Sequence, residues 1–256
     1  KALTLSYDDG TIHDRKMIEI MNHYGIRGTF HLNGGLLNEG GRLTSAEIPA
    51  LFDGHEVSSH TLTHLPIARC PLHQVSRQIL DDRAVLENIL QYPVRGISYP
   101  YGSYTQEIKQ LLPALGIEYA RTVDSSHMFT QPVDFLEWKA TCHHNENLLE
   151  HTQEFIQLLK RPYLYLFYVW GHSHEFEHHN NWSLFINFCE KIGGRDDIWY
   201  ATNIEYLDYC KALCQLRFSA DCSFVFNPTI IDLWISIGNN TIHIPKGKQI
   251  SINECE

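Results

Sequence analysis

The sequence predicts an α/β protein, a closed or nearly closed (β/α) barrel with about seven parallel strands, followed by a small antiparallel β module. Two observations predict this. Strand-like and amphipathic helical stretches alternate over roughly the first 210 residues, which implies a parallel sheet with helices outside it. From residue 213 the helical period is lost, and β-branched and aromatic runs alternate with turn residues. We therefore divide the chain into residues 1–212 and 213–256.

The predicted strands are short, mostly apolar runs that are bounded by turn residues. The first, ALTLSY, is uninterrupted and ends at two acids, as a strand buried on both faces would. The strands are expected at 2–7, 28–33, 55–60, 96–100, 118–123, 163–170 and 198–201.

The predicted helices show apolar residues at a spacing of three and four. In the longest, residues 72–90, this stripe includes Val75, Ile79 and Leu86. A shorter helix over 45–52 is expected to begin with Ser45 as its cap. The remaining helices are expected at 13–24, 105–115, 146–160, 182–192 and 203–214.

Composition excludes several classes of partner. The net charge of −10 argues against nucleic acid and anionic membranes, and no run is long enough to span a bilayer. No signal peptide is visible, although the chain begins at Lys1 on the edge of an apolar run. The seven cysteines include no CxxC pair, so we expect mostly free thiols, which favours a reducing, cytoplasmic compartment.

Acids and histidines gather where two predicted strands end. Asp8 and Asp9 follow the first strand, and His60 and His64 follow the third. If the turn after the third strand is helical, both imidazoles lie on one face and can bind one cation together with one of the two carboxylates. The other aspartate is then a candidate general base. The alternatives are an ordinary Asp-Asp-Gly turn and two solvated histidines.

These residues carry a family resemblance. The motifs LSYDDGT, HTLTH, YPYG and VWGH resemble, in order and spacing, those of the polysaccharide deacetylases, the NodB homology group or carbohydrate esterase family four. The resemblance covers roughly residues 1–212 and implies a distorted (β/α) barrel. It further implies a divalent metal, usually zinc and sometimes cobalt or another ion, held by Asp9, His60 and His64. Asp8 would be the general base.

The resemblance also implies roles on the other side of the site. The backbone amide of Tyr101 would help to hold the oxyanion, and His172 would be the general acid. His174, two residues further on, competes with His172 for that role. Candidate substrate contacts are Pro100, Tyr101, Trp138 and Trp170, with core packing as the alternative for the aromatic residues.

The sequence departs from the family pattern in two motifs. The family has an arginine two residues before the motif proline, and Ser98 stands there instead. Because neighbouring parallel strands end at one rim, we expect Arg121, at the end of the next strand, to reach Asp8 in its place. Arg95 precedes its strand and is the weaker candidate. The fourth motif is not recognisable, and the histidines of DFLEWKATCHH are assigned no ligand role.

Three functions fit these residues. The first is a metal-dependent amidohydrolase that removes N-acetyl groups from an N-acetylglucosamine-containing polysaccharide or oligosaccharide. The second keeps the metal site but acts on a small non-carbohydrate amide, as in the allantoinase-like branch. The third is a non-catalytic carbohydrate-binding protein.

Overall fold

The structure, a computed structural model, describes residues 1–159, 164–238 and 240–252. The chain forms two compact units. The first comprises Lys1–Leu158 and Tyr165–Ile204, and the second comprises Leu159–Leu164 and Glu205–Glu256. The units divide near the start of helix α8 (Asn203–Leu213), whereas the sequence analysis placed the division near the end of that helix.

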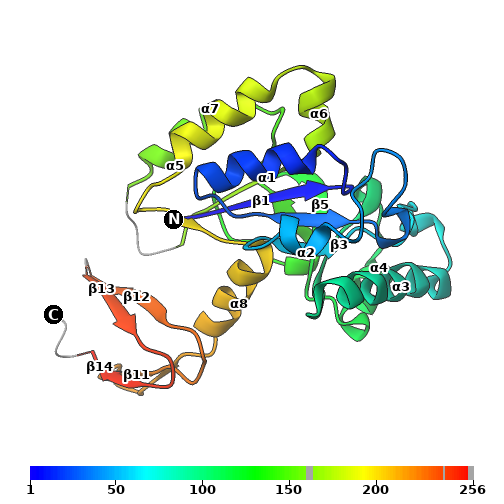
Figure 1. Ribbon diagram of the computed structural model, residues 1–256. Coiled ribbons are helices and arrows are strands. Elements are labelled where there is room, and N and C mark those ends of the chain that lie inside the picture. Colours follow the sequence, from blue (N-terminus) through cyan, green and yellow to red (C-terminus); the bar gives the residue numbers. More distant parts are fainter. Residues whose placement is uncertain (160–163, 239, 253–256) are drawn as a thin grey trace. The chain divides into compact units, whose positions relative to one another are not determined.

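One parallel sheet forms the centre of the first unit (Figure 1). Its order is β6-β5-β4-β3-β2-β1-β8-β7, and β9 also pairs with β1. Every strand pair in this sheet is parallel, as predicted. The strands are β1 (Ala2–Asp8), β2 (Thr29–Leu32), β3 (Glu56–Ser59), β4 (Gly96–Ser98), β5 (Tyr119–Ser125), β6 (Trp138–Ala140), β7 (Cys142–His143), β8 (Leu166–Gly171) and β9 (Trp199–Tyr200).

Strands β6 and β7 close this sheet into a barrel. Only Thr141 separates them, yet β6 pairs with β5 and β7 pairs with β8. Thr141 continues the second pairing, because its N–H donates to the Tyr168 carbonyl at 2.7 Å. If β6 and β7 are counted as one interrupted strand and the short β9 is set apart, the barrel has the seven strands that were predicted.

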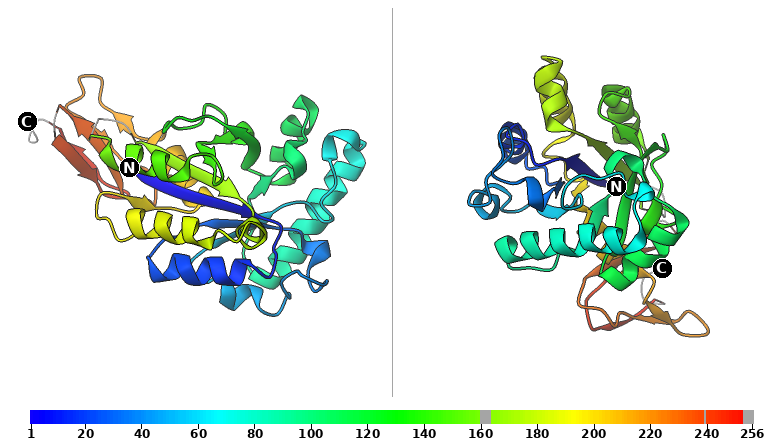
Figure 2. Two further views of the ribbon diagram at one scale, coloured as in Figure 1. Left: turned by 90° about the horizontal axis from the view of Figure 1, so that it is seen from above. Right: turned by 90° about the vertical axis from the view of Figure 1, so that its right-hand side faces the viewer.

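Helices cover the outside of the barrel (Figure 2). Helix α1 packs against α6 and α7, and α5 packs against α7. The helices are α1 (Asp14–His23), α2 (Ile48–Leu51), α3 (Leu72–Leu90), α4 (Gln106–Leu111), α5 (Leu148–Gln157), α6 (Ser173–His178) and α7 (Trp182–Ile192). Short 3₁₀ turns lie at Gly34–Leu36, Ile67–Arg69, Pro100–Gly102, Leu112–Leu115 and Phe135–Glu137.

Most predicted elements are present, with ends shifted by a few residues. The helix expected over 45–52 is shorter: it begins at Ile48, and Ser45 donates to Asn38 instead of capping it. One α-helix and two strands of the first unit were not predicted, namely α6, β6 and β7, and neither were most of the 3₁₀ turns. The last residue of the predicted helix 146–160 and the first of the predicted strand 163–170 lie outside the described residues.

The inside of the barrel is polar and hydrogen-bonded. Ser6 Oγ lies 2.6 Å from His31 Nε2, and Tyr119 donates to Glu56 at 2.7 Å. Buried polar groups are tolerated when they have partners. Hydrogen-bonded polar side chains inside the barrel therefore lie beneath the charged side chains at the strand ends.

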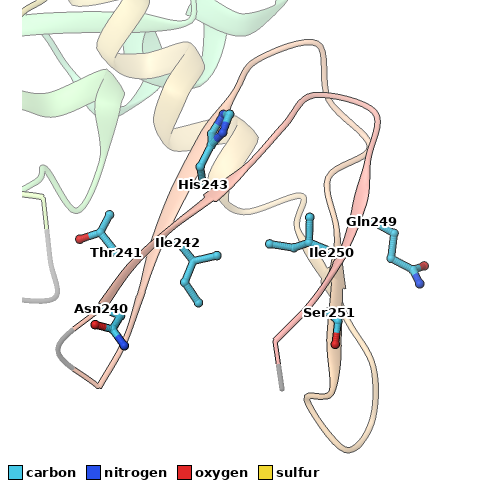
Figure 3. Close-up of a pocket in the computed structure, with 7 residues that line it drawn as sticks. All are labelled: Asn240, Thr241, Ile242, His243, Gln249, Ile250 and Ser251. Carbon is cyan, nitrogen blue, oxygen red and sulfur yellow. The ribbon is translucent and has the colours of Figure 1, made fainter. Parts of the chain in front are cut away.

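The second unit contains the antiparallel β module that was predicted. Strands β10 (Arg217–Phe218), β11 (Phe224–Phe226) and β14 (Gln249–Ser251) form one sheet, and β12 (Leu233–Ile237) pairs with β13 (Asn240–Ile244). Val225, Ile244 and Ile252 form its small core. A hollow of about 750 Å³ lies between β13 and β14, with Ile242 and Ile250 pointing into it (Figure 3).

The described cysteines, which exclude Cys255, are free thiols, as expected. Among the described residues, no helix combines the length and apolar character needed to cross a bilayer.

A close approach between β4 and β5 gives a test of the fold. A Cβ at Gly96 would lie 2.0 Å from Tyr119 Cζ, inside the barrel wall. Gly96→Ala should therefore lower the melting temperature and destabilise the protein by about 1–3 kcal/mol, as overpacking does. Gly40→Ala is the matched control, because nothing lies within 4 Å of its added Cβ. Equal melting of both variants would contradict this packing.

Candidate active site

Two adjacent aspartates, Asp8 and Asp9, lie at the carboxyl end of β1. Asp8 is the last residue of the strand and is 2% exposed. Asp9 has a positive φ of 85°, and Gly10 follows at 61°. The Asp9 N–H donates to the His31 carbonyl at 3.0 Å, and Arg42 donates to the Asp9 carbonyl. The two carboxylates remain close neighbours, because His60 Nε2 lies 3.8 Å from Asp8 Oδ2 and 3.8 Å from Asp9 Oδ1.

Asp8 lies in a cationic and hydrogen-bonded environment. Arg121, itself fully buried, donates to Asp8 Oδ2, and Ser98 donates to Oδ1 at 3.1 Å. Burial alone would raise the pKa of Asp8, but the Arg121 guanidinium and the nearby His60 hold that pKa well below its usual range. The predicted contact between Arg121 and Asp8 is thus present. Arg95 instead pairs with Glu118.

Asp9, His60 and His64 form a candidate metal centre. Asp9 Oδ1 lies 3.8 Å from His60 Nε2 and 3.5 Å from His64 Nε2. The three potential ligand atoms all lie within 4.8 Å of one another. The segment that carries the histidines is not helical, contrary to the supposition above, and Thr61 and His64 have positive φ angles of 64° and 57°. The bent loop nevertheless brings both imidazoles to Asp9.

The chemistry of these residues fits a divalent ion. Asp9 Oδ1 is buried and accepts no hydrogen bond from any described residue. His60 Nδ1 lies 2.9 Å from the Ser98 carbonyl and 2.6 Å from Ser98 Oγ, so its proton is held there. The Nε2 lone pair then faces Asp9, as in metal ligands whose other nitrogen donates to a carbonyl. Burial lowers the pKa of His60 to about 4, which favours the neutral form that ligates.

Asp82 supports the loop that carries these histidines. It comes from α3, accepts from Ser59 Oγ and from the Gly34 N–H at 2.5 Å each, and is fully buried. Burial raises the pKa of Asp82 to about 7. The sequence analysis missed this residue, because an aspartate on a helix gives no sign of which strand it meets.

His172 lies directly after β8, at the N-terminus of α6. Its Nδ1 lies 2.7 Å from Glu175 Oε1. Burial would lower the pKa of His172, but the Glu175 hydrogen bond and the charges of Asp8 and Asp9 raise it above its usual value. His174, the competing candidate, has a pKa lowered by burial. The surroundings therefore favour the protonated form of His172 more than that of His174.

The four candidate substrate contacts differ in accessibility. Tyr101 is 67% exposed, and its ring centroid lies 4.5 Å from that of His64, beside the candidate metal centre. Pro100 is buried, and Trp170 is 8% exposed and stacks over the Arg121 guanidinium at 4.2 Å. Trp138 is fully buried against Tyr119 and Tyr168. It offers no face to a sugar, so core packing is the correct interpretation for that residue.

The fold and the site define a class: parallel (β/α) barrels with an Asp-His-His centre at the carboxyl ends of the strands. The family model for polysaccharide deacetylase matches residues 1–120. Over those residues the chain is similar to the polysaccharide deacetylases, which form carbohydrate esterase family four or the NodB homology group, and the resemblance seen in its motifs is confirmed.

The chain spans about half the length of the curated relatives that it matches. A chitooligosaccharide deacetylase from Sinorhizobium fredii is 27% identical over 110 residues, which are 42% of this chain and 50% of that protein. One from Rhizobium leguminosarum is 29% identical over 112 residues, 42% of this chain and 47% of that protein.

Solved structures share the fold over most of the chain. The Xyl-CE4 domain of a xylanase from the hindgut metagenome of Trinervitermes trinervoides is 16% identical, with a TM-score of 0.56, over 83% of this chain and 92% of that one. A Clostridium thermocellum acetyl xylan esterase in complex with cobalt is 13% identical, with a TM-score of 0.54, over 81% and 91%. A mutant of BA3943, a pseudoenzyme of the same family, is 15% identical, with a TM-score of 0.56, over 81% and 67%.

Removal of one imidazole tests the metal centre. After zinc loading and dialysis, the wild type should retain about one ion per chain, and His60→Ala or His64→Ala should retain much less, because three protein ligands are needed. Asp8→Asn should keep its zinc. His23→Ala, an exposed histidine on α1, is the control. Full zinc content in both His60→Ala and His64→Ala would refute the assignment of these ligands. Loss of zinc from Asp8→Asn would mean that Asp8 is the ligand and Asp9 the candidate base.

Proposed function

We propose that this protein is a metal-dependent deacetylase that removes N-acetyl groups from N-acetylglucosamine-containing oligosaccharides or polysaccharides. The observation that carries the proposal is the division of the aspartate pair. Asp8 is paired with Arg121, whereas Asp9 Oδ1 accepts no hydrogen bond from the described residues and faces two imidazoles. The names of the curated relatives support the substrate class.

Asp9, His60 and His64 would hold the ion, zinc or another divalent metal such as cobalt. When bound, it would act as a Lewis acid and make a nearby water easier to deprotonate.

Asp8 is the proposed general base. Arg121 and Ser98 fix both of its oxygens, so the carboxylate has one orientation. Because its pKa is held low, Asp8 remains ionised at any ordinary working pH and is able to accept the proton of the attacking water.

His172 is the proposed general acid. Water adds to the acetyl carbonyl, the C–N bond breaks, and the departing nitrogen takes a proton from His172, which leaves acetate and a free amine. The Glu175 hydrogen bond and the charges of Asp8 and Asp9 raise the pKa of His172 despite its burial, which favours the proton-donating form. The backbone amide of Tyr101 is the proposed donor to the oxyanion, and its exposed ring is a surface on which a sugar ring can stack.

Acetate release from chitooligosaccharides tests the proposed function. The wild type should release acetate, a chelator should abolish the release, and Asp8→Asn should lower turnover by a factor on the order of 10² to 10⁴ while it retains zinc. Activity on a small amide such as allantoin alone would support the allantoinase-like alternative. Sugar binding without any acetate release would identify a carbohydrate-binding protein.

The pH profile tests the role of Arg121. Loss of the cation raises the pKa of Asp8, so the acidic limb of kcat/KM should move to higher pH in Arg121→Met. Arg121→Lys keeps the charge and should move the limb less. Circular dichroism must show that both variants fold, because loss of a buried ion-pair partner costs about 3–5 kcal/mol. An unmoved limb with normal turnover would contradict this role.

A further inference from the structure

The Glu175 carboxylate is surrounded by nitrogen atoms. Oε1 lies 2.7 Å from His172 Nδ1. On the other oxygen, Asn145 Nδ2 donates at 2.8 Å, and His144 Nε2 and His143 Nε2 lie at 2.9 and 3.4 Å. Glu175 and these four partners are called the Glu175 cluster below. The sequence analysis assigned Glu175 no role in the reaction.

We propose that Glu175 is the positioning residue of His172: it holds the Nδ1–H of that imidazole and so leaves the transferable proton on Nε2. This inference rests on the proposed function, in which His172 is the acid. Glu175 reaches His172 because the two are three residues apart in the first turn of α6, where side chains at i and i+3 are neighbours.

Hydrogen-bond directions within the cluster support this interpretation over a second metal centre. His143, His144 and Glu175 also have ligand atoms within 4.8 Å of one another. However, His143 Nδ1 accepts from the Asn145 N–H at 3.2 Å, so the proton of neutral His143 lies on Nε2, which faces Glu175. His60 shows the opposite arrangement, with Nδ1 against a carbonyl and Nε2 toward Asp9. The Nε2 proton of neutral His143 therefore points toward Glu175, where a metal would need a lone pair.

Packing around His144 and a hydrogen bond from Ser173 hold the Glu175 cluster in place. The His144 side chain is fully buried, and its ring centroid lies 4.1 Å from that of Phe176 on α6. A Cβ at Gly171 would lie 2.0 Å from His144 Nδ1, so only glycine at the end of β8 leaves room for this ring. Ser173, beside His172, donates to the buried Asp14 of α1. Helix α6 is thereby anchored on both sides of Glu175.

Several other charged or titratable groups face His172. They include Asp8 at the end of β1 and Asp9 after it, His64 after β3, Asp14 on α1, His143 and His144 at β7, and His174 on α6. Glu175 differs from the others because it alone is recorded in a direct hydrogen bond to the His172 ring among the described residues. Its removal should therefore alter both the tautomer and the pKa of His172.

The test uses the zinc-loaded full chain with ¹⁵N-labelled histidine. His172 is assigned by comparison with His172→Gln, and Glu175→Gln is compared with the wild type. We expect the pKa of His172 to fall by about one pH unit or more and its Nδ1–H signal to be lost, because an adjacent anion is removed. On chitooligosaccharides, kcat should fall about tenfold with little change in KM, and the basic limb should move to lower pH. In Glu175→Asp the pKa of His172 should fall less than in Glu175→Gln, because the negative charge is kept.

Glu177→Gln is the matched control, because it removes one acid from the same helix at an exposed position that bonds Trp182. It should leave the pKa of His172 unchanged. An unchanged pKa and kcat in Glu175→Gln would overturn the proposal, as would two zinc ions per chain in the wild type with one lost in Glu175→Gln. If the wild type releases no acetate, the ¹⁵N measurement still decides the role of Glu175, so the two failures are distinguishable.

Discussion

The site depends on one buried ion pair, that of Asp8 with Arg121. An ionised carboxylate inside a barrel is costly without a partner, and Arg121 lies fully buried against it. Ser98 and the polar interior below supply further hydrogen bonds. With one aspartate committed to this cation, its neighbour Asp9 is available to His60 and His64. The ion pair thus explains how two adjacent acids could take different proposed roles, Asp8 as the base and Asp9 as a metal ligand.

The backbone makes that division possible. Asp9 has a positive φ of 85°, and its backbone N–H and carbonyl bond to His31 and Arg42. Across the site, Glu175 does for His172 what Arg121 does for Asp8: an oppositely charged neighbour favours the protonation state that the proposed role requires. Each of the two side chains proposed to react therefore has a charged partner from outside the motifs that carry the family resemblance.

Much of this could be predicted from the sequence, because strand order fixes which residues share a rim. The alternation of strands and helices predicted the barrel. The contact of Arg121 with Asp8 was also predicted, although Arg121 lies inside β5, opposite Ser98 at the end of β4, and not at the end of its strand as expected. β6 and β7 were missed because each is only two or three residues long. Trp138 was wrongly included among the candidate substrate contacts, because the sequence of a short strand does not show whether an aromatic side chain points into the core or toward solvent. Glu175 was missed because α6, which brings it to His172, was not predicted.

Anomalous diffraction from crystals of the zinc-loaded protein is the most direct test of the central claim. We expect a single strong zinc peak bonded to Asp9, His60 and His64, with the Asp8 carboxylate still against Arg121. A peak bonded to Asp8, with Arg121 turned away, would contradict it, because the ion pair would then not be what separates the two aspartates.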